Sequence, residues 1–146
     1  MKKVIFISLI SLMFLFVSAN DLFACSCVAS PNPVKQQVKD SYKNSAAIFS
    51  GEIVSITPKD EWTVNVKIKV TKFWKGSALS NEIIITTSKE SAMCGYNFEV
   101  GKKYLVYATG TKENLSTTNC SRTAIFGDKQ EIKFLDRLKK TKGKSA

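Results

Sequence analysis

Residues 62–70 read WTVNVKIKV, and this stretch decides the fold class of the chain. From Trp62 to Val70, every second side chain is apolar and those between are polar, which is typical of a strand with one buried face. A parallel sheet is covered on both faces, so the polar face favours an antiparallel sheet or a barrel.

Four more strands are expected around this stretch. They are residues 46–57, 83–87, 104–109 and 115–118. Gly51 predicts a bulge or bend in the first of them, residues 58–60 a turn after it, and Gly110 a hairpin loop between the last two. Five strands in roughly 75 residues with short loops predict a small sandwich or a closed barrel, so the fold class is mainly β.

A helix is predicted before the strands, from Pro33 to Asn44. Proline suits a first helical turn, and Val34, Val38 and Tyr42 recur on one face at a spacing of four.

A second helix is predicted after the strands. Asp128 is its expected N-cap and Glu131 the partner in a capping box, followed by an apolar stripe. The stripe consists of Ile132, Leu135 and Leu138, and the basic tail after it contains Lys139, Lys140, Lys142 and Lys144.

Residues 1–24 have the three-part layout of a secretory signal peptide, with a basic start, an apolar run and a short tail. The run from Val4 to Ala19 has 16 residues. A bilayer requires roughly 20, so no stable membrane span is expected. We expect cleavage after Ala24, with cleavage after Ala19 or lipoprotein processing at Cys25 as alternatives. The chain would then be secreted or periplasmic.

Four cysteines in an exported chain predict two disulfides. A bridge between Cys25 and Cys27 would close a strained ring, so each is expected to pair with Cys94 or Cys120. Spacing alone leaves both crosswise pairings open. The spacing also lacks the paired CxxC motifs of structural zinc sites, so no metal site of its own is expected.

The sequence has 22 Lys and Arg, 12 Asp and Glu and no His, which gives a net charge of +10. Without histidine, the chain cannot form a Ser-His-Asp or Cys-His triad or an HExxH zinc site. No GxSxG or SxxK context indicates a serine nucleophile either. We therefore expect neither an enzyme nor a cofactor.

Several short motifs together resemble the N-terminal domain of the tissue inhibitors of metalloproteinases, over about residues 25–126. They are ACSC at 24–27, FWKG at 73–76, CG at 94–95, VGKKYL at 100–105 and a last cysteine at 120. The signal peptide suggests a bacterial member. Two features differ from the family pattern, because the cysteines of its third disulfide in this domain are missing and a lysine-rich helix stands where the family has a second domain.

The resemblance implies a netrin-like, five-stranded OB-fold barrel with flanking N-terminal and C-terminal helices. It also implies disulfides from Cys25 to Cys94 and from Cys27 to Cys120. The expected division is then a signal peptide at 1–24, the netrin-like domain at 25–126, and a C-terminal helix with its basic tail at 127–146.

The resemblance implies a function as well, namely inhibition of an extracytoplasmic zinc metallopeptidase. In the family, the N-terminal residue chelates the catalytic zinc of the target through its α-amine and its carbonyl oxygen. On this chain Cys25 would be the chelator, and Ser26 would enter the specificity pocket beside the zinc. The implied inhibitory ridge consists of Cys25, Ser26, Cys27, Val28, Ala92 and Met93.

The alternative is a binding module that engages a protein or an acidic polymer. From Cys25 onward, the chain has 20 basic and 11 acidic side chains, a net charge of +9. The cations expected to contribute are Lys67, Lys69, Lys102, Lys103 and the tail from Lys139 to Lys144. Nucleic acid is not an expected partner, because an exported, disulfide-bonded chain has little access to it.

Overall fold

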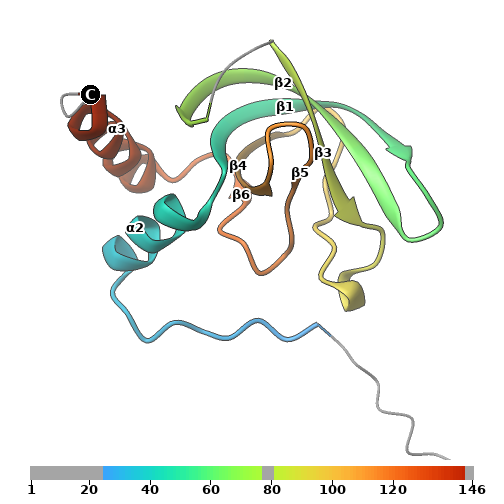
Figure 1. Ribbon diagram of the computed structural model, residues 1–146, viewed down its shortest axis with the longest axis horizontal. Coiled ribbons are helices and arrows are strands. Elements are labelled where there is room, and N and C mark those ends of the chain that lie inside the picture. The colour runs from blue at the N-terminus through green and yellow to red at the C-terminus, as the bar shows by residue number, and fades with distance from the viewer. Residues whose placement is uncertain (1–24, 77–80, 144–146) are drawn as a thin grey trace, which may run out of the picture.

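The computed structural model describes residues 25–76 and 81–143. Its elements form a β-barrel with two α-helices packed on one side (Figure 1). The expected signal peptide at 1–24 and Lys144 in the basic tail lie outside the described residues. No helix in the described part of the chain is long and apolar enough to cross a membrane.

In residues 25–76 and 81–143, six strands make up the sheet. They are β1 (Ala47–Pro58), β2 (Thr63–Lys75), β3 (Glu82–Ser88), β4 (Lys103–Gly110), β5 (Leu115–Ser116) and β6 (Ala124–Ile125). The order β1-β2-β3-β5-β4 closes on itself because β1 pairs with both β2 and β4. β3 and β5 are parallel and the other pairs are antiparallel. The result is the five-stranded barrel implied by the resemblance, and not a sandwich.

The alternating stretch of the sequence forms the first half of β2, as predicted. Val66 and Ile68 are fully buried inside the barrel, whereas Lys67 and Lys69 are turned away from it. One detail of the prediction is wrong: Trp62 lies before the strand and is 58% exposed. β2 also continues to Lys75, five residues beyond the alternating stretch.

Gly51 marks the predicted bulge in β1. The pairing register with β2 shifts between Ser50 and Gly51, where β1 lies between its two neighbouring strands. A Cβ atom at Gly51 would lie 2.6 Å from both Ile68 Cγ2 and the Lys69 carbonyl oxygen. Only glycine lets the two backbones approach this closely.

β4 is buried on both faces, which explains why its sequence does not alternate. Tyr104, Val106 and Ala108 belong to the core inside the barrel. Leu105 and Tyr107 belong to a second core beneath the helices. A strand between two apolar layers has no wet face.

The helices are α2 (Val34–Asn44) and α3 (Lys129–Gly143), close to their predicted positions. Val38, Tyr42 and Leu135 are buried in the second core. Val34 differs from the prediction because it is 60% exposed. The Asp128 Oδ1 atom accepts hydrogen bonds from the backbone N–H groups of Gln130 and Glu131, and so caps α3 as predicted.

The FWKG motif at 73–76 attaches both helices to the barrel. The Trp74 indole donates a 2.7 Å hydrogen bond to Asp136 Oδ1 on α3. The Lys75 ammonium donates to the carbonyls of Tyr42 and Lys43 in the last turn of α2, at 2.7 and 2.9 Å. This cation neutralises part of the negative end of the helix dipole. The motif therefore has a structural role.

Candidate functional site: the N-terminal ridge

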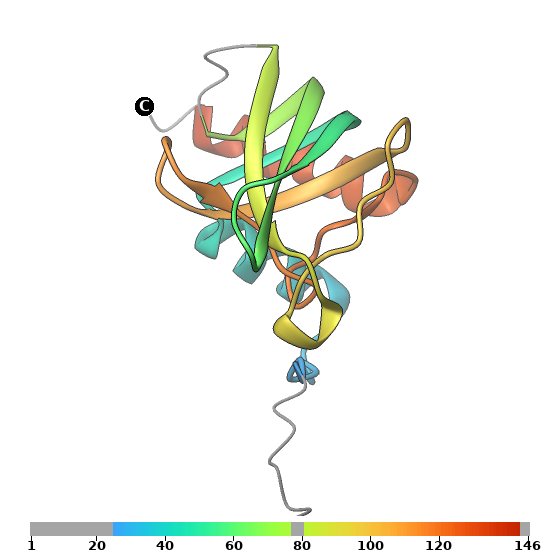
Figure 2. The ribbon, with the colours of Figure 1, turned by 90° about the vertical axis from the view of Figure 1, so that its right-hand side faces the viewer.

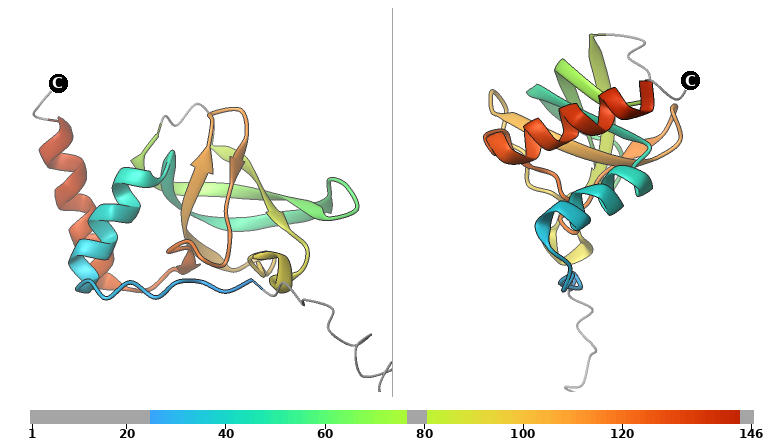
Figure 3. Two further views of the ribbon diagram at one scale, coloured as in Figure 1. Left: turned by 60° about the horizontal axis from the view of Figure 1, so that its bottom comes forward. Right: turned by 90° about the vertical axis from the view of Figure 1, so that its left-hand side faces the viewer.

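Residues 25–33 form an extended segment that runs beneath the barrel to the start of α2 (Figure 3). Disulfides hold it at Cys25 and Cys27. Nearer α2, the Gln37 amide donates hydrogen bonds to the carbonyls of Asn32, at 2.7 Å, and Ser30, at 3.4 Å. The segment is thus fixed at both ends although it belongs to no helix or strand.

The structure pairs Cys25 with Cys94 and Cys27 with Cys120, with Cα–Cα distances of 5.1 and 5.2 Å. This is the pairing implied by the family resemblance, and one of the two that the spacing left open. The Sγ atoms of Cys25, Cys27 and Cys120 lie within 4.8 Å of one another. All three belong to disulfides, so they offer no thiolate to a metal ion.

A second segment lies beside the first one. It is the short 3₁₀ helix η1 (Ser91–Met93), which lies next to the Cys25 end of the chain (Figure 2). The Cys25 backbone N–H donates a 2.8 Å hydrogen bond to the Ala92 carbonyl oxygen. Together with the Cys25–Cys94 disulfide, this bond fixes the two segments side by side.

The Cys94-Gly95 pair shapes the turn that presents η1. Cys94 has a φ of 61°, in the left-handed region that non-glycine residues rarely occupy. Gly95 is buried, and a Cβ atom there would lie 2.2 Å from the Ser88 carbonyl oxygen. The turn therefore requires glycine at position 95, which explains this motif in physical terms.

We call residues 25–28 and 92–93 the ridge. They include the six residues that the sequence analysis named, and the contacts of Cys25 bring their two segments together. Val28 is 97% exposed and Met93 39% exposed, and Ser26 is exposed as well. Val28 and Met93 thus place exposed apolar side chains on the two segments of the ridge.

Asn119 supports the ridge, although no sequence pattern predicted this role. Its backbone N–H donates to the Cys94 carbonyl at 3.0 Å, and its side-chain amide donates to the Ser91 carbonyl at 3.3 Å. Its Oδ1 atom lies 3.3 Å from the Cys25 sulfur. In the sequence, only the position of Asn119 directly before Cys120 connected it to the ridge. That position does not show that the loop containing Asn119 packs against η1.

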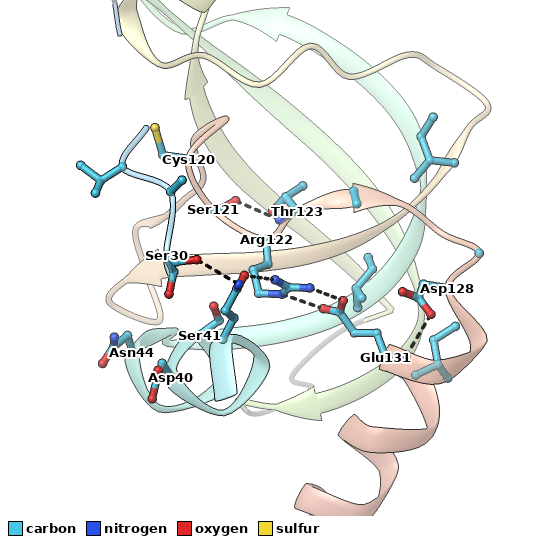
Figure 4. A pocket seen from close by; sticks show the side chains of 18 residues that line it. Ser30, Asp40, Ser41, Asn44, Cys120, Ser121, Arg122, Thr123, Asp128 and Glu131 are labelled. Carbon is cyan, nitrogen blue, oxygen red and sulfur yellow. Dashed lines mark hydrogen bonds and ion pairs between the residues drawn. The ribbon is translucent and has the colours of Figure 1, made fainter. Parts of the chain in front are cut away.

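A groove of about 620 Å³ lies beside the ridge (Figure 4). Its walls come from residues 28–30, the polar side of α2, the loop 120–127 and the start of α3. Arg122 lies in the middle of this groove and points to Glu131. The guanidinium donates to both carboxylate oxygens, at 2.6 and 3.2 Å, and to the Gln37 side-chain oxygen at 3.1 Å.

The Glu131 carboxylate is also the acceptor for the Tyr107 hydroxyl, at 2.5 Å. Burial, followed by this hydrogen bond, raises the pKa of Tyr107 far above its ordinary value. The hydrogen bond to Glu131 likewise raises the pKa of Arg122, so both groups keep their protons at neutral pH. The carboxylate of Glu131 thus pairs with Arg122 and Tyr107. The capping-box prediction is correct for the Asp128 cap but wrong for Glu131, which was expected to pair with the start of its own helix.

This network joins α2, β4, the Cys120 loop and α3. Every buried side-chain nitrogen and oxygen in the described part of the chain has a hydrogen-bond partner. The groove therefore contains no unpaired buried group ready for acid–base chemistry, and we assign the network to holding the loop that carries Cys120.

Four of the cations proposed for an acidic polymer have other contacts. Lys67 pairs with Glu82 at 3.3 Å, and Lys102 pairs with Glu99 at 2.8 Å. Lys103 lies over the Phe126 ring, and the Lys139 ammonium donates to the Phe73 carbonyl. These residues do not form one free basic patch.

A family model described as tissue inhibitor of metalloproteinase matches residues 23–132. The match covers the barrel, α2, both disulfides and the first turn of α3. No curated protein matches the sequence.

Proposed function

The chain belongs to the tissue inhibitor of metalloproteinase family, and we propose that it is an exported inhibitor of an extracytoplasmic zinc metallopeptidase. Proteins of this family inhibit metalloproteinases and are not enzymes. They are extracellular, which is consistent with export of this chain. The observation that carries the proposal is the fixed position of the Cys25 nitrogen on an exposed ridge.

In the proposed mechanism, cleavage after Ala24 turns the Cys25 nitrogen into a free α-amine. A catalytic zinc keeps an open coordination position, and a neutral amine is a good nitrogen ligand. An α-amine titrates at about 7.7–8.0, so deprotonation at pH 7 costs about 1 kcal/mol. The amine and the Cys25 carbonyl oxygen together would displace the water molecule on the target zinc.

The hydrogen bond to Ala92 supports this role. A neutral amine has two N–H donors and one lone pair. When one N–H remains bonded to the Ala92 carbonyl oxygen, as in the 2.8 Å contact of the structure, the nitrogen is held in place while its lone pair remains available to zinc. The ridge therefore favours chelation before any target is bound.

The exposed side chains would extend the interface along the target's cleft. Ser26 directly follows the chelating residue and enters the pocket beside the zinc. Val28 and Met93 provide apolar contact surface on the two segments of the ridge. Because two disulfides already fix the backbone, binding costs little ordering entropy.

The test is inhibition of purified zinc metallopeptidases, measured by cleavage of a fluorogenic peptide. We expect the disulfide-bonded chain with Cys25 at its start to slow cleavage. Acetylation near pH 7, which favours the α-amine over lysine because of its lower pKa, should abolish the effect.

The matched control is a chain with one alanine added before Cys25. It keeps a free amine and the same net charge but moves the amine away from the ridge, so it should not inhibit. Equal potency of the acetylated, extended and unmodified chains would contradict the chelation mechanism. Inhibition of no zinc peptidase in the panel would count against the function itself.

A further inference from the structure

A second groove, of about 480 Å³, is lined by residues of α2, α3 and the turn before α3. Val34 and Phe134 form apolar parts of its lining, and Val34 is 60% exposed. Three cationic side chains line the same groove, namely Lys35 on α2 and Lys133 and Arg137 on α3. We call these five residues the helix-pair face.

The three cations of this face are exposed. Among the described residues, they form no ion pair or side-chain hydrogen bond, in contrast to Lys72, which pairs with Asp136. Asp128 also lines this groove and is exposed, so among the described residues the three cations stand against one exposed carboxylate.

The two acidic residues within α3 are paired with other groups. Glu131 is turned toward Arg122 and Tyr107, and Asp136 toward Lys72 and Trp74. Both carboxylates are therefore committed to contacts with the barrel. On α2, Asp40 accepts a hydrogen bond from Gln36 and lines the other groove, beside the ridge segment. The helix-pair face therefore keeps an excess of positive charge over the carboxylate of Asp128.

We propose that the helix-pair face docks on an anionic lipid bilayer. Peripheral helices that bind such surfaces combine exposed apolar groups with flanking Lys and Arg, whose chains reach the headgroups while the apolar groups enter the interface. The arrangement of Val34 among Lys35, Lys133 and Arg137 has this form. A hydrated acidic polymer would use the cations but would leave Val34 without a role.

Docking in this way leaves the ridge free. The helix pair lies at one end of the segment 25–33, and Cys25 and η1 lie at the other (Figures 1 and 3). A bilayer on the helices therefore does not cover Cys25 or Met93. The proposal does not depend on metallopeptidase inhibition, but it would hold an inhibitor at a membrane with its ridge exposed.

The test is co-sedimentation of the chain recovered after export with vesicles. One set contains phosphatidylcholine alone, and the other contains phosphatidylcholine mixed with phosphatidylglycerol. We expect binding to the anionic vesicles only, and binding that falls as salt rises. Replacement of all three cations in K35Q/K133Q/R137Q should weaken it on the order of 100-fold, since each cation contributes about fivefold near such a surface.

The matched control is K59Q/K69Q/K112Q, which removes the same charge from exposed positions in the barrel loops and on β2. It should keep most of the binding. Val34→Ser changes no charge and should weaken binding severalfold, because less apolar surface enters the interface. Circular dichroism and parallel inhibition assays should show all three variants folded and still inhibitory.

If both triple variants lost vesicle binding to the same extent, the proposal would be overturned, because binding would then depend on net charge alone. Binding to a soluble polyanion that requires the same three cations, without binding to anionic vesicles, would assign the face to a polymer and overturn it as well. Equal binding to neutral vesicles would indicate a lipid anchor at Cys25, also against the proposal.

Discussion

The two ends of the described chain are attached to the barrel by different means. The N-terminal segment is held by two disulfides, the Cys25–Ala92 backbone hydrogen bond and hydrogen bonds from the Gln37 side chain, and Val28 within it is 97% exposed. The helix α3 is held by burial, with Leu135 fully covered and Glu131 only 8% exposed. Covalent attachment leaves the side chains exposed and able to bind a partner, whereas attachment by burial places the side chains in the core.

Because of this difference, the contacts that stabilise the fold are not the ones that would bind a partner. The disulfides close loops of 69 and 93 residues, and such loops restrict the unfolded chain strongly. The ridge can therefore be rigid without a core of its own. For α3, the same contacts that hold the helix also stabilise the fold, so changes there should alter stability more than inhibition.

The largest effect is expected when the second disulfide is removed in Cys27→Ser/Cys120→Ser. The free energy of unfolding should fall by about 4 kcal/mol in the chain-entropy model, and inhibition should weaken because residues 27 and 28 lose their attachment. Denaturant unfolding and peptidase assays measure the two effects. A variant with unchanged inhibition would show that the Cys25–Cys94 bridge alone positions the ridge.

A smaller loss, of stability only, is expected for Glu131→Gln. This change leaves the half-buried Arg122 guanidinium without its carboxylate and should cost about 2 kcal/mol. The control is Arg122→Met/Glu131→Met, which removes both charges and should recover much of the loss. Inhibition should remain in both variants at temperatures where they are folded. Loss of inhibition in proportion to stability would mean that the two ends are coupled.

Asn119→Ala should have the opposite effect to Glu131→Gln, with weaker inhibition and almost unchanged stability. It removes the amide contact with Ser91 and the packing against Cys25, so inhibition should weaken roughly tenfold while the free energy of unfolding changes by less than about 1 kcal/mol. Asn97→Ala, at an exposed position that is not part of the ridge, is the matched control. Equal inhibition by the two variants would exclude a positioning role for Asn119.

The smallest effect concerns the acid stability of the α3 attachment. The hydrogen bonds from Lys72 and Trp74 lower the pKa of Asp136 below its ordinary value. A lowered pKa in the folded state stabilises the protein above about pH 4, the ordinary pKa of the group, and this contribution is lost as the pH falls further. The Asp136 side chain is 37% exposed, so solvent screening limits the contribution to a few tenths of a kcal/mol, about the value of a surface pair.

Asp136→Asn should therefore remove part of the stability loss on acidification below about pH 4. Thermal unfolding over an acidic pH series measures how steeply the stability falls with pH. The same slope in the variant and in the wild type would mean that other carboxylates dominate this range.

Patterns of neighbouring residues predicted most of the secondary structure. The alternation along β2, the glycine bulge in β1 and the Asp128 cap are local features, and each was found where it was expected. Local patterns failed where tertiary contacts compete, as for Glu131, which pairs with Arg122 and not with the end of its own helix. β6 and η1 carry no periodic signal because each is only two or three residues long.

The sequence by itself determined the five barrel strands, the two helices, the four cysteines and the family resemblance, because these depend on residue types and their spacing. Only the tertiary structure closed the barrel through β1 and β4, placed Asn119 against the disulfides and left Lys35, Lys133 and Arg137 around one groove. Such contacts join residues that are far apart in the chain. They depend on how the elements pack against one another, which residue spacing does not encode.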